Sequence, residues 1–364
     1  MLSTIKPILV MSYKSILPKF LWKHILFYLP ISAILKMTSI SKTHTGIIAD
    51  ADWKKYFLED RYGSIAIVRC NHATMSHFWL YALANYEICK NINKAFSIIA
   101  KNAISDTAPF IYYKIFIKKG HYHVSSRKKF DFKYVKCSIE LIGSSSKTII
   151  YGTFIEINLR QAFTMSNITF HIDRFNFTNY DPNKKDMLYI SKCIFEKGTM
   201  QKGTMLNILS SNITIFECMF KTDVWSYGYK IIITKCTFDS NILSIVSTFD
   251  STISFCSFTN CPIYQYHGSG ITSKITVTDN KISDTDILFD VYCECQTFIF
   301  KNNFISNVKS CVKSRYGSTI TFEDNVFDNV ERLCTGMKQD HVKLASNNTF
   351  IHCGDQLTNY ANTE

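Results

Sequence analysis

The sequence predicts a mainly β protein whose largest part is a right-handed, single-stranded parallel β-helix. Three observations lead to this fold class. Segments of one shape recur about every 22 residues, each alternates apolar and polar residues before a small residue, and an apolar residue usually follows two positions later. Alternation with a period of two is typical of a strand with one buried face. Repetition at a fixed spacing of this length indicates a solenoid.

The repeated segments read "LYISKCIF" at 188–195, "ITIFECMF" at 213–220, "IIITKCTF" at 231–238 and "TISFCSF" at 252–258. The small residue that ends each strand forms one column along the chain, and the break in alternation there predicts a corner of the coil. This residue is cysteine in the first four repeats and asparagine in the last four: Cys193, Cys218, Cys236, Cys256, Asn280, Asn302, Asn325 and Asn348.

The chemistry of the column differs between its two halves. Asparagine tolerates a left-handed corner well, and its amide can bond to the same amide one coil away. Because stacked amides stabilise parallel strand arrays, the four asparagines are predicted to form a ladder. Cysteine is small and apolar enough to be buried, so the four cysteines are predicted to pack as a thiol column without such a ladder. No paired C-x2-C spacing occurs in the sequence, so no metal or cofactor is expected.

Three segments upstream continue the alternation, at 111–124, 138–152 and 162–172. They resemble the opening coils of the pectin-lyase-like superfamily, in which a Pro-Gly-x-Tyr motif separates two strands and a turn follows the second. Lys119 stands in place of the proline here, whereas Gly120 and Tyr122 match the motif. The resemblance covers roughly residues 107–353 and implies the fold, but it implies no activity.

The N-terminal part has a helical period instead. Apolar residues between Leu21 and Leu29 fall on one helical face, Pro30 ends that helix, and Ser32 can cap the next one. Three short helices of this composition carry more apolar surface than about 40 residues can bury alone. We therefore expect this part of the chain to bind a partner.

The same residues resemble an F-box. That family begins with Leu-Pro, runs through spaced apolar residues to a second Leu-Pro, and continues with a Val-Ser-Lys segment and a late Trp-Lys pair. The matching positions that would contact the adaptor are Leu17, Pro18, Leu21, Ile25, Leu26, Leu29, Leu35, Ile40 and Trp53. The resemblance implies docking on the Skp-type adaptor of a cullin–RING ubiquitin ligase, by burial of an apolar helix face.

The chain is thus divided into an N-terminal extension (1–16), the F-box (17–58), a helical connector (59–105), the β-helix (107–355) and a C-terminal tail (356–364). Neither a secretory leader nor an apolar run of membrane-spanning length is found, so no membrane association is expected. The thirteen cysteines are expected to be reduced thiols in the cytoplasm or nucleus. Since the composition resembles that of large DNA viruses, the compartment would be that of a host cell.

These elements together predict a non-catalytic substrate-recognition subunit of a ubiquitin ligase, whose β-helix binds a protein. The net charge of +12 favours an acidic partner. The densest basic segment, 127–136, alternates with apolar residues like a strand with a solvated face, so nucleic acid is not the expected partner.

Two alternatives stay open at this point. A polysaccharide lyase or hydrolase would need paired carboxylates, and the acidic run at 283–290 offers Asp284 and Asp286. Aspartate near a solenoid corner is more often a turn former, so no catalytic residue is predicted. A structural or nucleic-acid-binding β-helix would show its basic residues in one continuous stripe.

Overall fold

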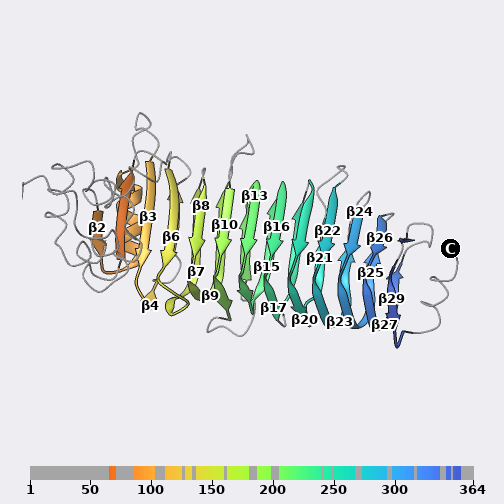
Figure 1. The fold of residues 1–364 in the computed structure, drawn as a ribbon. Helices are drawn as coiled ribbons and strands as arrows, with labels where there is room; N and C mark the ends of the chain where they lie inside the picture. The colour runs from red at the N-terminus through yellow and green to blue at the C-terminus, as the bar shows by residue number, and fades with distance from the viewer. Residues whose placement is uncertain are drawn as a thin grey trace, which may run out of the picture.

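The computed structural model describes residues 65–70, 86–102, 111–124, 128–132, 137–159, 162–179, 187–197, 205–239, 241–247, 249–266, 273–292, 297–314, 318–336, 342–345 and 347–353. They form a parallel β-solenoid of about eight turns with coils of about 23 residues. The strands stack side by side along one axis (Figure 1). The predicted mainly β fold and its repeat are confirmed, whereas the right-handed winding stays a prediction.

One sheet of 13 strands forms the first face of the coil, here named face 1. In spatial order its strands are β2 (Tyr86–Cys89), β1 (Ile65–Cys70), β3 (Ile111–Ile117), β6 (Cys137–Gly143), β8 (Phe163–Ser166), β10 (Met187–Ser191), β13 (Asn212–Phe216), β16 (Lys230–Thr234), β19 (Ser251–Ser254), β22 (Lys274–Thr278), β24 (Thr297–Lys301), β26 (Thr319–Glu323) and β28 (Val342–Leu344).

The second sheet has 16 strands and provides two further faces, because its long strands pair with a different short strand at each end. The long strands are β7 (Thr148–Leu159), β9 (Thr169–Asn179), β23 (Lys281–Val291), β25 (Phe304–Ser314) and β27 (Val326–Thr335). Face 2 adds β4 (Gly120–His123), β11 (Ile194–Glu196), β14 (Met219–Phe220), β17 (Thr237–Asp239), β20 (Ser257–Thr259) and β29 (Thr349–Ile351). Face 3 adds β5 (Lys128–Phe132), β12 (Met205–Leu209), β15 (Asp223–Gly228), β18 (Leu243–Ser247) and β21 (Ile263–Gln265).

The segment before the first coil is only partly the predicted helical connector. The helix α6 (Ile92–Asn102) is present, with Phe96 buried against Phe130 at 4.5 Å between ring centroids. β1 and β2, however, are strands: β1 pairs antiparallel with β3 and with β2. The prediction of a wholly helical connector is therefore wrong. β1 satisfies the backbone groups that the edge strand β3 of the first coil would otherwise leave unpaired, and β2 covers the outer edge of β1.

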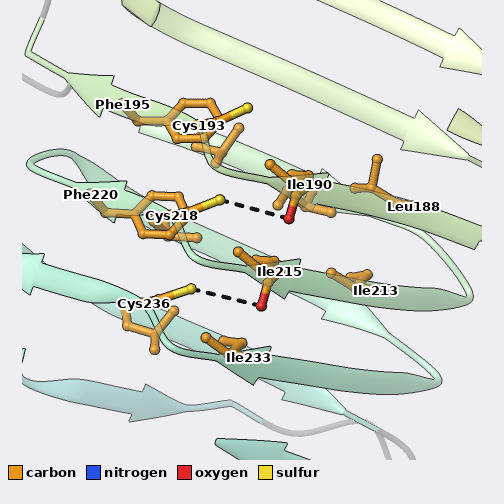
Figure 2. Close-up of a cluster of buried hydrophobic side chains, with 14 of the residues drawn as sticks. Leu188, Ile190, Cys193, Phe195, Ile213, Ile215, Cys218, Phe220, Ile233 and Cys236 are labelled. Carbon is orange, nitrogen blue, oxygen red and sulfur yellow. Dashed lines mark hydrogen bonds between the residues drawn. The ribbon is translucent and has the colours of Figure 1, made fainter. Parts of the chain in front are cut away.

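The solenoid core consists of the inward side chains of every coil. Phenylalanines two positions after the column form a stack between Phe170 and Phe258, with neighbouring centroids 4.8–5.1 Å apart. That separation equals the spacing of adjacent strands, so each ring packs on its copy in the next coil. The repeated Cys-x-Phe thus places the thiol at the corner and the ring in the core (Figure 2). No helix among the described residues is long and apolar enough to span a membrane.

The left-handed residue at each corner is the one that precedes the column, not the column residue itself. Eight residues there have φ between 52° and 69°: Lys192, Glu217, Lys235, Phe255, Asp279, Asn302, Asp324 and Asn347. Asn302 is therefore the corner residue of its coil, and its neighbour Asn303 occupies the column. The assignment of Asn302 to the ladder is wrong by one position, because the sequence offers two adjacent asparagines there.

The amide half of the column is a continuous hydrogen-bonded ladder. Asn303 donates from Nδ2 to Asn325 Oδ1 at 2.9 Å, and its backbone N–H donates to the same oxygen at 3.0 Å. A further bond from Nδ2 of Asn303 reaches the carbonyl of Val277 in the previous coil at 2.9 Å. Asn280 and Asn325 repeat the pattern, and Asn348 ends it with a 3.0 Å bond to the carbonyl of Phe322. Each amide thus ties three coils together.

The thiol half makes a weaker version of the same contacts, which the sequence analysis did not expect. Cys218 and Cys236 each donate to a carbonyl of the previous coil at 3.7 Å, from Sγ to Ile190 O and to Ile215 O (Figure 2). These carbonyls occupy the position that Val277 occupies for Asn303. The backbone N–H of Cys236 likewise approaches Sγ of Cys256 at 3.4 Å. All described cysteines are free thiols.

Candidate recognition surface

Face 3 carries two outward rows of side chains that differ from the rest of the solenoid. In the first row, strand register aligns Lys129, Glu156, Asn176, Asn207, Trp225, Ser244, Tyr264, Asp290 and Lys313. In the second row it aligns Asp131, Asn158, Thr178, Leu209, Tyr227 and Val246. Both rows run along the solenoid axis, perpendicular to the strands.

The middle of face 3 is aromatic. Trp225 and Tyr227 project outward from β15 because alternation places Val224 and Ser226 on the inner side, and the two rings are 46% and 47% exposed. The Trp225 ring stacks on Tyr266 at 5.7 Å between centroids, and Tyr266 stacks on Tyr292 at 5.1 Å. Large, half-exposed Trp and Tyr rings are the side chains most enriched at binding hot spots.

Polar groups lie on the N-terminal side of the aromatic rings. Asn207 donates from Nδ2 to Asn176 Oδ1 at 2.8 Å, across adjacent strands. Glu156, one strand further, accepts from Lys129 at 2.8 Å and from Asn158 at 3.1 Å. The hydrogen bond from the Lys129 ammonium lowers the pKa of Glu156 below its ordinary value, so the carboxylate is ionised and paired at neutral pH.

An open depression of about 400 Å³ joins the two regions. Its lining comes from β7, β9, β12, β15 and β18, and includes Glu156, Asn176, Asn207, Trp225 and Tyr227. The hydroxyl of Ser244, also in the lining, is 1% exposed and has no hydrogen-bond partner. This arrangement suits non-covalent recognition: an aromatic wall for apolar contact, amides for hydrogen bonds and a shape open to an elongated ligand.

The polar C-terminal side of the rings is occupied by a buried carboxylate. Asp290 is 5% exposed and accepts from the Tyr292 hydroxyl at 3.0 Å, and Lys313 Nζ lies 3.9 Å from it. Burial, assisted by the charge of Asp290, raises the pKa of Tyr264 above its ordinary value. Tyr264 therefore stays neutral at physiological pH.

The acidic pair singled out in the sequence lies at the corner between faces 2 and 3. Asp284 has φ 60° and accepts from Asn307 at 2.9 Å, while Asn307 accepts from Asn329 at 2.9 Å. Asp286 is exposed and paired with Lys309 at 2.7 Å. The hydrogen bond from Asn307 lowers the pKa of Asp284. Asp284 is thus one rung of a short corner ladder, consistent with a turn former.

The other predicted site residues are distributed as follows. The nine F-box positions, from Leu17 to Trp53, lie outside the described residues. Of the predicted column residues, the four cysteines, Asn280 and Asn325 are buried inside the solenoid and cannot contact a ligand, whereas Asn302 is exposed at the corner and Asn348 is half-buried at the end of the ladder. Two histidines that were not among the predicted site residues, His121 and His123, both stack on Tyr151, at 5.5 and 5.2 Å between centroids. Among the described residues no group of three or more His, Cys, Asp or Glu side chains could hold a metal ion.

The rows of face 3 were missed by the sequence analysis. A signal existed in "DVWSYG" at 223–228, where aromatic residues take the outward phase of the alternation. Its significance depends on Asn176 and Asn207 lying beside it, and the intervening loops vary in length enough to hide that register. In comparisons with known proteins, no family model, no curated protein and no solved structure matches the chain.

Proposed function

We propose that this protein is a non-catalytic substrate receptor of a cullin–RING ubiquitin ligase and that face 3 of its solenoid binds the substrate. In this proposal residues 17–58 dock on the Skp-type adaptor, as the resemblance to an F-box implies. The observation that carries the recognition half is the half-exposed Trp225–Tyr227 pair beside the Asn176–Asn207 amides. The adaptor half is supported by the residue pattern of the N-terminal module alone.

The chemistry of face 3 favours binding over catalysis. Its one carboxylate in the depression, Glu156, is held ionised by Lys129, so it is a poor proton donor at neutral pH. Glycoside hydrolysis needs a second carboxylate across a cleft, about 5–9.5 Å away. The residues that line the depression include no second carboxylate. The aromatic and amide side chains, by contrast, are those that protein interfaces use.

The test separates the two halves of the chain. The adaptor variants are Leu17→Ala/Pro18→Ala and Ile25→Asp/Leu26→Asp. Each should abolish co-purification with adaptor and cullin from cells while the melting temperature of the solenoid is unchanged, because the modules have separate cores. Retained cullin association in both variants would contradict the receptor function.

Face 3 is tested in the same cells. Trp225→Ala/Tyr227→Ala should leave adaptor and cullin association intact and abolish ubiquitination of any protein whose modification depends on the parent chain. The matched control is Phe255→Ala, which removes a 59% exposed aromatic ring at a corner between faces 1 and 2. Equal loss of ubiquitination in the Phe255→Ala control would contradict the assignment of substrate binding to face 3.

A further inference from the structure

The Asn176–Asn207 pair leaves the amide nitrogen of Asn176 and the amide oxygen of Asn207 without a partner. A side-chain amide has two N–H donors and a carbonyl oxygen. The single bond between the two residues uses Nδ2 of Asn207 and Oδ1 of Asn176. Within the described part of the chain, no hydrogen bond occupies Nδ2 of Asn176 or Oδ1 of Asn207, and both side chains line the depression. A free donor and a free acceptor thus lie on adjacent strands, about 4.8 Å apart.

The Trp225 ring borders the same depression. One side of the indole stacks on Tyr266, two coils further along, and the ring also forms part of the lining next to Asn207. An apolar ring of a ligand can therefore stack on the side of the indole that is turned to the depression, and the adjacent Tyr227 extends this wall.

The charges of the depression argue against a phosphate-bearing ligand. Among the residues that line the depression, Glu156 is the only carboxylate and no ammonium is present, and Glu156 is already paired with Lys129. A nucleic acid would bring its phosphates to a carboxylate and two amides, with no cation in the lining to receive them. The uncharged backbone of a peptide ligand, with its alternating N–H and C=O groups, matches the free amide nitrogen of Asn176 and the free amide oxygen of Asn207 instead. The buried Ser244 hydroxyl, which has no partner, offers a third polar group at the aromatic end.

We propose that the depression binds an extended peptide segment of the partner protein along the solenoid axis. Its backbone bonds to Asn176 and Asn207, and a proline or aromatic ring of the peptide stacks on Trp225. The depression crosses five strands, from β7 with Glu156 to β18 with Ser244, a distance of about 19 Å along the solenoid axis. An extended chain covers that length with about six residues. This inference rests on the proposed function for the identity of the partner as a substrate, but not for the binding itself.

The experiment selects a phage-displayed random peptide library on the full-length protein and measures the dissociation constants of synthetic versions of the enriched peptides. We expect the enriched peptides to share a proline or aromatic residue. Trp225→Ala should weaken binding at least about tenfold, and Asn207→Ala about five- to tenfold. Trp225→Phe should retain most of the affinity, and Phe255→Ala should have no effect. Melting temperatures of all variants should stay within about 4 °C of the parent.

Methylation of single backbone nitrogens in the best peptide should abolish binding at one position and be tolerated at its ends. The proposal is overturned if no peptide is enriched, if Trp225→Ala and Asn207→Ala bind like the parent, or if soluble glycans occupy the depression and peptides do not. Adaptor binding is measured on the same preparations. Adaptor binding without peptide binding would refute only the proposal that the depression binds a peptide. Peptide binding without adaptor binding would refute only the proposed function as a ubiquitin-ligase receptor.

Discussion

The corner column and the outer rows of face 3 are formed by the same coils, yet they differ in regularity. At the column, successive coils place one small polar or thiol group against a carbonyl of the previous coil, from Cys218 to Asn348. In the outer row, neighbouring coils carry Asn207, Trp225 and Ser244 in succession. A buried position must satisfy the same packing in each coil, whereas an outer position is free to change. Stability is thus encoded in the repeat and recognition in departures from it.

Raising the pH should have the largest effect on the solenoid core, because it acts on several buried thiols at once, one of them in the column. Burial raises the pKa of the Cys218 thiol, and it raises the pKa of Cys137 and Cys334 to about 12. Thiols of the unfolded chain ionise near pH 8.5 to 9, so above that range the unfolded state releases protons that the folded state keeps. The free energy of unfolding should be constant below about pH 8.5 and then fall by about 1.4 kcal/mol per pH unit for each such thiol.

Urea unfolding across neutral and alkaline pH measures this effect. In Cys334→Ala, the fall in the free energy of unfolding per pH unit at alkaline pH should be smaller by the contribution of one thiol. A slope that is identical in this variant and the parent would mean that other groups, not the buried thiols, cause the loss.

Removing one amide from the ladder should have the next largest effect. Asn303→Ala deletes the side-chain bonds to Val277 and Asn325 and removes the acceptor of the Asn280 backbone N–H in the core, whereas the Asn325 oxygen keeps its bond from the backbone N–H of residue 303. The expected loss is about 3 kcal/mol or more in the free energy of unfolding, measured by chemical denaturation. The matched control is Asn302→Gly at the exposed left-handed corner, which should cost well under about 1 kcal/mol. Equal losses would show that the corner, not the ladder, carries the stability.

Substitutions where the thiol half of the column meets the amide half should change the free energy of unfolding less. Cys256→Ser replaces a thiol that contacts the carbonyls of Ile233 and Ser254, and the smaller, more polar hydroxyl should cost about 1–3 kcal/mol if its bonds are not remade. Cys256→Asn extends the amide ladder by one coil, toward the backbone N–H of Cys236. It should be neutral or stabilise by up to about 1 kcal/mol. A larger loss for the asparagine than for the serine would show that the thiol half is too tightly packed for amides.

The smallest effect on stability is expected on face 3. Trp225→Ala removes a 46% exposed ring, so the free energy of unfolding should change by no more than about 1 kcal/mol, while partner binding is lost. Thermal denaturation and binding measured on one preparation check both points. A variant that melts far below the parent would place Trp225 among the structural residues.

The same contrast explains what could be predicted from the sequence. The solenoid, its period and the buried column were predictable because each coil repeats one pattern. Asn303 was misassigned because two asparagines are adjacent, and backbone φ rather than composition decides which one turns the corner. β1 was taken as part of a helical connector because its role depends on pairing with β3, which is not visible locally. The Asn176–Trp225 surface depends on register across loops of unequal length, so a single strand reveals only part of it.

Recognition by face 3 is tested most directly by photo-cross-linking from two positions of the full-length protein in cells. A photoreactive phenylalanine analogue replaces Tyr227 in one variant and Phe255 in the other; both side chains are exposed, on different parts of the solenoid. We predict one cross-linked partner from position 227 that is absent from position 255 and that disappears when Trp225→Ala is added. The same partners from both positions, or a partner from position 255 alone, would contradict the assignment of recognition to face 3.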